Sequence, residues 1–168
     1  MRPEGHLATS VAMSGVAYAS TGSMELATSL FAGGFAIDLD HYFDYVVFER
    51  QRSLNPIRFL NYYFKRRARY AVLLLHSYEL MAGLTLLAMA TGSLPLAGYL
   101  AGATVHLILD ILYNGYLLKD PVRFYSFAYR YAHNFENVHL LKPLPPPPPF
   151  DLPRRYRIIL SSAPTAAR

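Results

Sequence analysis

Cysteine is absent from this 168-residue chain, and charged residues make up only 16% of it. Without cysteine there is no disulfide framework, no zinc finger and no thiol nucleophile, so any metal must be bound by histidine, aspartate or glutamate. Soluble domains average about 25% charged residues, whereas hydrophobic residues reach 53% here. The composition excludes a largely disordered chain and predicts burial of apolar side chains, within the protein or in lipid.

Several functional motifs are also missing. The sequence has no glycine-rich phosphate loop, no Gly-X-Ser-X-Gly nucleophile elbow and no recognisable nucleic-acid-binding module. Its formal charge of +5 suits an anionic partner, and the apolar composition favours a membrane surface over nucleic acid. We therefore expect no nucleic-acid partner.

Long apolar runs with few ionisable residues, in which Ala, Leu and Met are frequent, dominate the first two thirds of the chain, and no useful β alternation is present. The runs cover 7–24, 26–37, 71–90 and 97–118. Turn-forming residues at 20–23 and 91–95 separate the members of each pair. The sequence predicts an all-α fold in which two apolar helical hairpins form a four-helix core.

The remaining segments are aromatic and basic, and they flank the open ends of the hairpins. Segments 42–70 and 119–142 have this character and predict additional interfacial helices. Residues 1–142 are expected to form one domain, and 143–168 a loosely ordered basic tail with five consecutive prolines. The tail is either a spacer or a binding segment for a protein partner with an SH3-like groove.

The hairpin legs are close to the ~20 apolar residues that a membrane-spanning helix needs. Positive charge lies at the ends of the second hairpin, at Arg66, Arg67 and Arg69 before it and Lys119 after it, whereas its tip carries none. This asymmetry predicts a membrane-embedded core in contact with membrane lipids, with both termini on the cytoplasmic side. The alternative is a soluble bundle of helices that are apolar all round.

Ionisable residues interrupt the apolar runs at a few positions. His106 and Asp110 are spaced to share a helix face, and so are His76 and Glu79. The others are His6, near the start of the first run, and Asp38, Asp40 and His41, at the end of the first hairpin. Such groups are costly in apolar surroundings unless they have a specific partner or function.

Within each hairpin, the ionisable residues of the two legs are separated from the connecting turn by nearly equal numbers of residues. Since an α-helix rises ~1.5 Å per residue, the spacing brings them to one layer at the basic end of the bundle. Helical bundles build carboxylate and imidazole metal sites by such convergence. Each residue taken singly is equally compatible with a hydrogen-bonded core group or an ion-pair partner.

Four short motifs carry a resemblance to the bacterial membrane-bound metal-dependent hydrolases of the YdjM type and, more distantly, to the zinc-dependent phospholipase C fold. They are Glu4-Gly5-His6-Leu7, Asp38-Leu39-Asp40-His41, His76-Ser77 and His106-Leu107-Ile108-Leu109-Asp110. The resemblance implies that metal ligands or their close neighbours are His6, Asp38, His41, His76, His106 and Asp110. It also implies a location in the bacterial inner membrane, with the site on the cytoplasmic side.

The resemblance and the residues together predict a hydrolase with one or two divalent ions, zinc or else manganese, and a metal-activated water. Asp40 and Glu79 are the candidates for orienting or deprotonating that water. Guanidinium groups at Arg66, Arg67 and Arg69 suit a phosphoryl group, so a phosphoester, in a small molecule or a lipid headgroup, is the expected substrate. The alternative is a non-catalytic membrane scaffold or metal-binding protein with the same fold.

Overall fold

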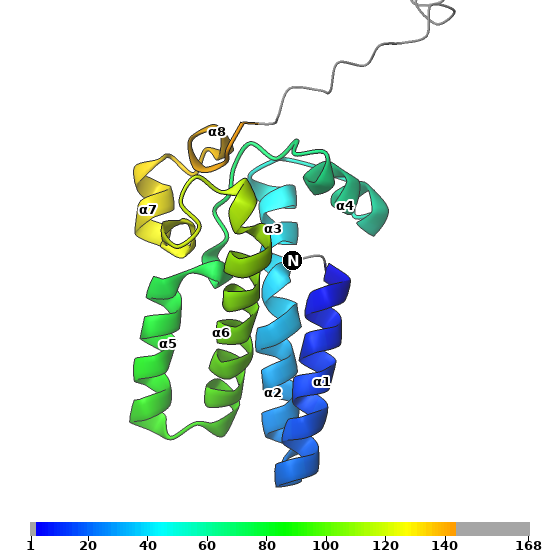
Figure 1. The fold of residues 1–168 in the computed structure, drawn as a ribbon, viewed down its shortest axis with the longest axis vertical. Coiled ribbons are helices and arrows are strands. Elements are labelled where there is room, and N and C mark those ends of the chain that lie inside the picture. The colour runs from blue at the N-terminus through cyan, green and yellow to red at the C-terminus, as the bar shows by residue number, and fades with distance from the viewer. Residues whose placement is uncertain (1–2, 144–168) are drawn as a thin grey trace, which may run out of the picture.

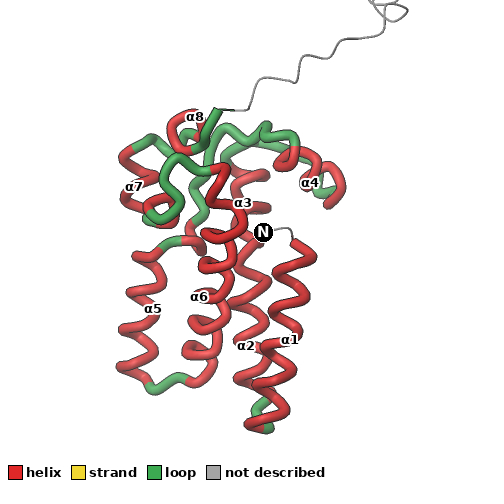
Figure 2. The backbone as a smooth tube through the Cα atoms, viewed as in Figure 1, coloured by secondary structure: helices red, strands yellow, loops and turns green. Residues whose placement is uncertain are grey.

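The computed structural model describes residues 3–143, and this part of the chain is helical, with isolated β-bridges in place of strands (Figures 1 and 2). The predicted all-α class is confirmed. The long helices are α1 (Pro3–Thr21), α2 (Met24–Phe35), α5 (Tyr78–Thr91) and α6 (Leu94–Asn114). The shorter ones are α3 (Leu39–Val47), α4 (Pro56–Phe64), α7 (Phe127–Ala132) and α8 (Asn137–Leu140). The residues of the predicted proline-rich tail after 143 lie outside the described part.

Both predicted hairpins are present, and their turns have the same construction. Gly22 and Gly92 adopt φ values of 69° and 63°, which cost glycine little because it has no Cβ. The next residues, Ser23 and Ser93, cap the following helices: each hydroxyl accepts a hydrogen bond from the backbone N–H three residues later, at 3.1 and 3.4 Å. The shorter helices gather at the opposite end of the bundle (Figure 1).

The two hairpins are joined by close contact between α2 and α6. A Cβ added to Gly33 would lie 1.9 Å from the carbonyl oxygen of Tyr99, and one added to Gly102 would lie 2.1 Å from that of Leu30. Only glycine permits this backbone approach. The contact fixes the C-terminal half of α6 beside the end of α2, where the polar residues of both hairpins meet.

The second hairpin begins later than the sequence predicts. We expected a helical leg from Ala71, but α5 starts at Tyr78, and residues 71–77 are irregular apart from a 3-10 turn at Leu74–His76, with Leu73 in the left-handed region at φ 44°. The physical reason is competition for backbone donors: carboxylates of α3 bind N–H groups of this segment that a helix would otherwise use.

Apolar side chains cover much of the outer surface of the long helices. α5 buries none of its residues, and exposed examples include Val16, Met89 and Leu112. One described helix, Leu94–Leu117, is long and apolar enough to cross a membrane, and Tyr78–Thr91 is a shorter apolar helix. The four-helix arrangement is therefore observed, whereas its embedding in a membrane stays a prediction.

Candidate metal centre

Seven of the predicted site residues converge where the two hairpins meet the shorter helices. They are His6 on α1, Asp38 in the 3-10 turn after α2, Asp40 and His41 on α3, His76 in the turn before α5, and His106 and Asp110 on α6. Most are buried; the side chains of Asp38 and His41 keep 27% and 29% exposure. The predicted convergence of both hairpins on one layer thus occurs for these residues.

Four donor atoms form the centre of the cluster. The Nε2 atoms of His76 and His106 lie 3.1 Å apart. Oδ1 of Asp38 lies 3.6 and 3.5 Å from these two nitrogens, and Oδ2 of Asp110 lies 4.0 and 3.5 Å from them. Tetrahedral ligands at 2.0–2.1 Å from zinc are about 3.3 Å apart. The two imidazole nitrogens therefore lie from each other, and from one oxygen of each carboxylate, at nearly the spacing of zinc ligands.

The outer ring nitrogens of the two central histidines are already engaged. Nδ1 of His106 lies 2.8 Å from the carbonyl oxygen of Gly34, which can only accept, so Nδ1 carries the proton. Nδ1 of His76 lies 3.0 Å from both carboxylate oxygens of Asp40. In their neutral forms both imidazoles therefore direct Nε2 lone pairs at one point, which favours a cation there. Metal-binding histidines in proteins have such outer partners.

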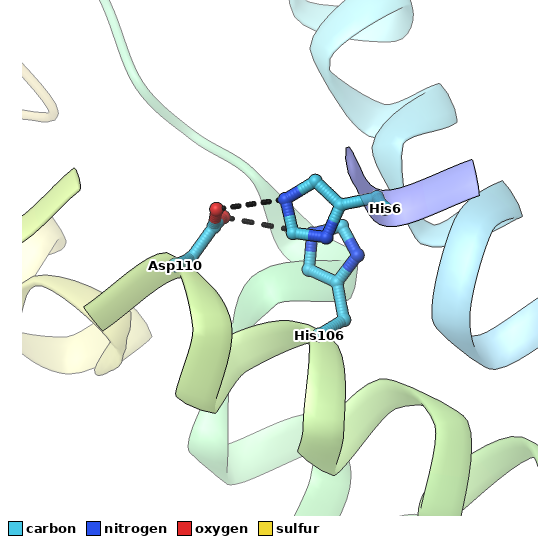
Figure 3. A group of neighbouring side chains, drawn as sticks. All are labelled: His6, His106 and Asp110. Atoms are coloured by element: carbon cyan, nitrogen blue, oxygen red, sulfur yellow. Dashed lines mark hydrogen bonds and ion pairs between the residues drawn. The ribbon is translucent and has the colours of Figure 1, made fainter. Parts of the chain in front are cut away.

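His6 and His41 flank this centre on two sides. His6 stacks on His106 with ring centroids 3.7 Å apart, and its Nε2 lies 2.9 Å from Oδ1 of Asp110 (Figure 3). His41 lies edge-on to His76, and its Nε2 is 3.8 Å from Oδ1 of Asp38. The Nδ1 atoms of His6 and His41 are buried without a hydrogen-bond partner in the described structure. These two imidazoles are candidates for extending the ligand set or for holding a second ion.

The cluster has an excess of negative charge that favours a proton or a metal ion. Burial alone would raise the pKa of Asp38, but the hydrogen bond to His76 and the nearby imidazoles lower it to about 2. Burial alone would lower the pKa of His76, but the adjacent carboxylates of Asp40 and Asp38 raise it to about 10. A divalent cation would take the place of this proton, and metal binding would release it.

Asp40 has a structural position more specific than its predicted role of orienting or deprotonating a water. Its Oδ2 accepts hydrogen bonds from the backbone N–H groups of Leu75 at 2.9 Å and of His76 at 3.2 Å, and both its oxygens contact the His76 ring. One turn later on α3, Asp44 accepts from the N–H groups of Val72 and Leu73 at 2.7 and 3.1 Å. The two carboxylates together hold the segment that carries His76.

Arg130 of α7 is a buried residue that sequence analysis did not identify. It is 0% exposed and donates hydrogen bonds from Nη1 to the carbonyl oxygens of His76 at 3.1 Å and Phe124 at 2.7 Å, and from Nη2 to that of Leu73 at 2.9 Å. Arg130 thus binds carbonyl groups of the same segment whose N–H groups are bound by Asp40 and Asp44. No sequence pattern distinguished it from the other arginines of the aromatic segments.

Glu79 is not brought to the cluster. Its carboxylate accepts hydrogen bonds at the start of α7, from the hydroxyl of Ser126 at 2.6 Å and the N–H groups of Phe127 and Ala128 at 2.7 and 3.1 Å. The expectation that it faces His106 assumed one helix through His76 and Glu79. Since α5 begins only at Tyr78, the three-residue spacing does not place these two side chains on a common helix face.

A pocket of about 510 Å³ reaches the cluster, with Asp38, His41 and Asp110 in its lining. Most of the other lining side chains are apolar or aromatic, including Phe35, Phe59 and Leu117. Of the three predicted phosphoryl-binding arginines, Arg66 lines this pocket. Arg67 and Arg69 line a neighbouring hollow instead, together with Arg66.

Comparison of the chain with protein-family models, curated proteins and solved structures finds no match in any of the three.

Proposed function

We propose that this protein is a membrane-associated, metal-dependent hydrolase that acts on a phosphoester. The observation that carries the proposal is the close approach of donor atoms: Nε2 of His76 and Nε2 of His106 lie 3.1 Å apart, and each lies 3.5–4.0 Å from a carboxylate oxygen of Asp38 and of Asp110. Without thiolate, this imidazole and carboxylate set suits zinc, with manganese as the second choice. The outer hydrogen bonds of both histidines support a metal ligand role further.

The residues around the centre have distinct tasks in the proposed reaction. A bound divalent ion supplies Lewis-acid stabilisation of negative charge and acidifies water. Asp40 acts as a positioning residue, since its oxygens hold the His76 ring and backbone. Arg66 lines the same pocket and supplies a guanidinium for the phosphoryl oxygens. Glu79 has no part in this proposal.

The pocket lining also restricts the substrate. Its walls are mostly apolar, and Arg66 is the cationic side chain among the described lining residues apart from the histidines. A ligand that fits therefore joins one anionic phosphoester to an apolar group. The volume of about 510 Å³ lies in the range of pockets for small organic ligands, ~300–1,000 Å³.

The membrane part of the proposal rests on the apolar outer faces of the long helices and on the basic residues at one end. In the inner membrane of a bacterium, the hairpin tips would face outward and the cluster would lie toward the cytoplasm. A cysteine at Ser93, in a hairpin tip, should react with an impermeant thiol reagent added outside intact cells, and a cysteine at Ser53 should not. Extraction of the protein by buffer without detergent would contradict the membrane location.

A non-catalytic scaffold is the second candidate, and one observation favours it. His6 pairs with Asp110 at 2.9 Å and His76 with Asp40 at 3.0 Å, so two imidazoles already have carboxylate partners. Buried pairs of this kind are also found as purely structural elements. In that case the cluster would hold protons rather than metal.

Metal analysis separates the two candidates. Protein purified in detergent without chelator should contain at least one zinc or manganese ion per chain and hydrolyse bis(p-nitrophenyl) phosphate. The double variant His106→Ala/Asp110→Ala should lose both properties. The control His133→Ala/Asp120→Ala removes the same residue types outside the cluster and should keep them. Wild-type protein that stays metal-free after dialysis against zinc and manganese would support the scaffold instead.

A further inference from the structure

A second hollow, of about 660 Å³, lies beside the pocket of the cluster and has a different chemical character. Its cationic lining residues are Arg66, Arg67, Arg69, Lys119 and Lys142, and we call this set the basic hollow. Glu136 is the acidic side chain of the described lining, and it pairs with His139 at 3.2 Å. No imidazole or aspartate lines the described part of the basic hollow. It adjoins the pocket of the cluster through shared lining residues, among them Arg66 and Asn137, whereas Arg67, Lys119 and Lys142 line the basic hollow and not that pocket.

The positive charges of the basic hollow are mostly uncompensated. Arg69 is 3.7 Å from a carboxylate oxygen of Glu49. Within residues 3–143, the other four cations have no carboxylate within 4 Å. Two of them donate hydrogen bonds to backbone oxygens instead. Nη2 of Arg66 donates to the carbonyl of Lys142 at 3.1 Å, and Nζ of Lys119 donates to the carbonyl of Val138 at 2.9 Å. Their charged ends are thus positioned without being neutralised.

Backbone pairing from three distant segments fixes the walls of the basic hollow. Residues 69–71 bond to 135–137, with N···O distances of 2.8 Å for Ala71 to Phe135 and 2.7 Å for Asn137 to the carbonyl of Arg69. Residues 117–119 bond to 140–142 at 3.0 and 2.9 Å. The tertiary fold therefore holds like charges together in a defined cavity, against their mutual repulsion. An anion in the hollow would offset that repulsion.

We propose that the basic hollow is a second binding site for a phosphate-bearing anion, which adjoins the proposed reaction site and shares Arg66 with it. Guanidinium pairs phosphate oxygens through two parallel hydrogen bonds, and the two lysines add compact charge. The phosphate of an anionic lipid headgroup and that of a soluble compound have this chemistry in common. The lipid is the favoured source, because the cations lie at the ends of the apolar hairpin α5–α6, where an inner-leaflet headgroup would be located.

The test is ligand-dependent thermal stabilisation of the full chain in a neutral detergent. Wild-type protein should gain melting temperature on titration with dioleoyl phosphatidylglycerol and not with dioleoyl phosphatidylcholine. The triple variant Arg67→Gln/Lys119→Gln/Lys142→Gln should bind phosphatidylglycerol about 100-fold more weakly. The control Arg50→Gln/Arg52→Gln/Arg58→Gln loses equal charge outside the basic hollow and should bind like wild type. Should the triple variant not fold, the single variant Lys119→Gln should still weaken binding about fivefold.

Each result decides the proposal. Stabilisation by phosphatidylglycerol but not by inorganic phosphate identifies a lipid ligand, and the converse identifies a soluble one. Equal weakening in the triple variant and its control, or no response to either ligand, overturns the site. The metal-free variant His106→Ala/Asp110→Ala should retain the response. Failure of the proposed hydrolase is thereby distinguished from failure of this site.

Discussion

Asp40 and Asp44 provide a test of the metal centre within a single helix. Both lie on α3 one turn apart, and both accept two backbone N–H groups from the segment before α5. Only Asp40 also contacts a histidine ring, that of His76, at 3.0 Å. Asp40→Asn therefore removes a charged partner of a proposed ligand, His76. Asp44→Asn changes only the contacts with the backbone of the segment before α5.

The size of the effect follows from these contacts. Asparagine keeps one oxygen for the N–H groups of Leu75 and His76, so the segment should remain bound. The loss is the charge that holds Nδ1 of His76 and increases the basicity of Nε2. Such outer partners typically contribute 10–100-fold to metal affinity, equivalent to about 1.4–2.8 kcal/mol. We expect Asp40→Asn to weaken zinc binding by that factor and Asp44→Asn to leave it within about twofold.

Competition with a chromophoric chelator in detergent measures both affinities, and chemical unfolding of the metal-free proteins checks that each variant is folded. Equal zinc affinity in wild type and Asp40→Asn would refute the assignment of Asp40 as the residue that orients His76. An equal loss in Asp44→Asn would show that the segment as a whole, rather than the contact with the ring, controls the site.

Three further expectations concern the supporting residues. Glu79→Gln keeps only one acceptor oxygen for the hydroxyl and two N–H groups at the start of α7. The free energy of unfolding should therefore fall by about 1 kcal/mol, and the affinity for zinc should not change. A weaker affinity for zinc would show that Glu79 belongs to the metal centre. Arg130→Met removes the guanidinium donor of three buried carbonyls, of which that of Leu73 keeps the N–H of His76. It should lower the free energy of unfolding in urea by about 3 kcal/mol, and an unchanged midpoint would refute this role. Burial raises the pKa of Asp44 from 3.8 to about 6, against the opposing backbone hydrogen bonds. The folded state then binds this proton more tightly than the unfolded chain, so wild type should lose stability relative to Asp44→Asn as pH rises from 4 through 6; parallel pH profiles would contradict it.

Local patterns in the sequence were sufficient to predict the helical class and both hairpins. Gly22 with Ser23 and Gly92 with Ser93 are a left-handed turn residue followed by a helix cap, and both signals act within a few residues. The convergence of polar residues was also predictable, because helical rise converts sequence distance from a turn into height along the bundle. His106 and Asp110 share a face of α6 for the same reason.

The errors arose where a distant group competes with local propensity. The apolar residues from Ala71 onward favour a helix, but Asp40 and Asp44 bind the backbone donors of that segment and keep it out of the α-helix. The late start of α5 then changes the direction of Glu79, which caps α7 instead of facing His106. Helical periodicity relates only residues within one helix, so it could not place Glu79, inside α5, relative to His76, which precedes α5.

By itself, the sequence determined the helical class, where the two hairpins turn, and that imidazoles and carboxylates meet at one level, since these depend on periodicity and turn chemistry. Only the tertiary structure decided which donor atoms face one another, that Arg130 is buried beside His76, and that Arg67 lies in a hollow apart from Asp38. The physical reason is that these properties depend on contacts between segments far apart in the chain, here fixed by the glycine contacts of α2 with α6 and by carboxylates on backbone N–H groups.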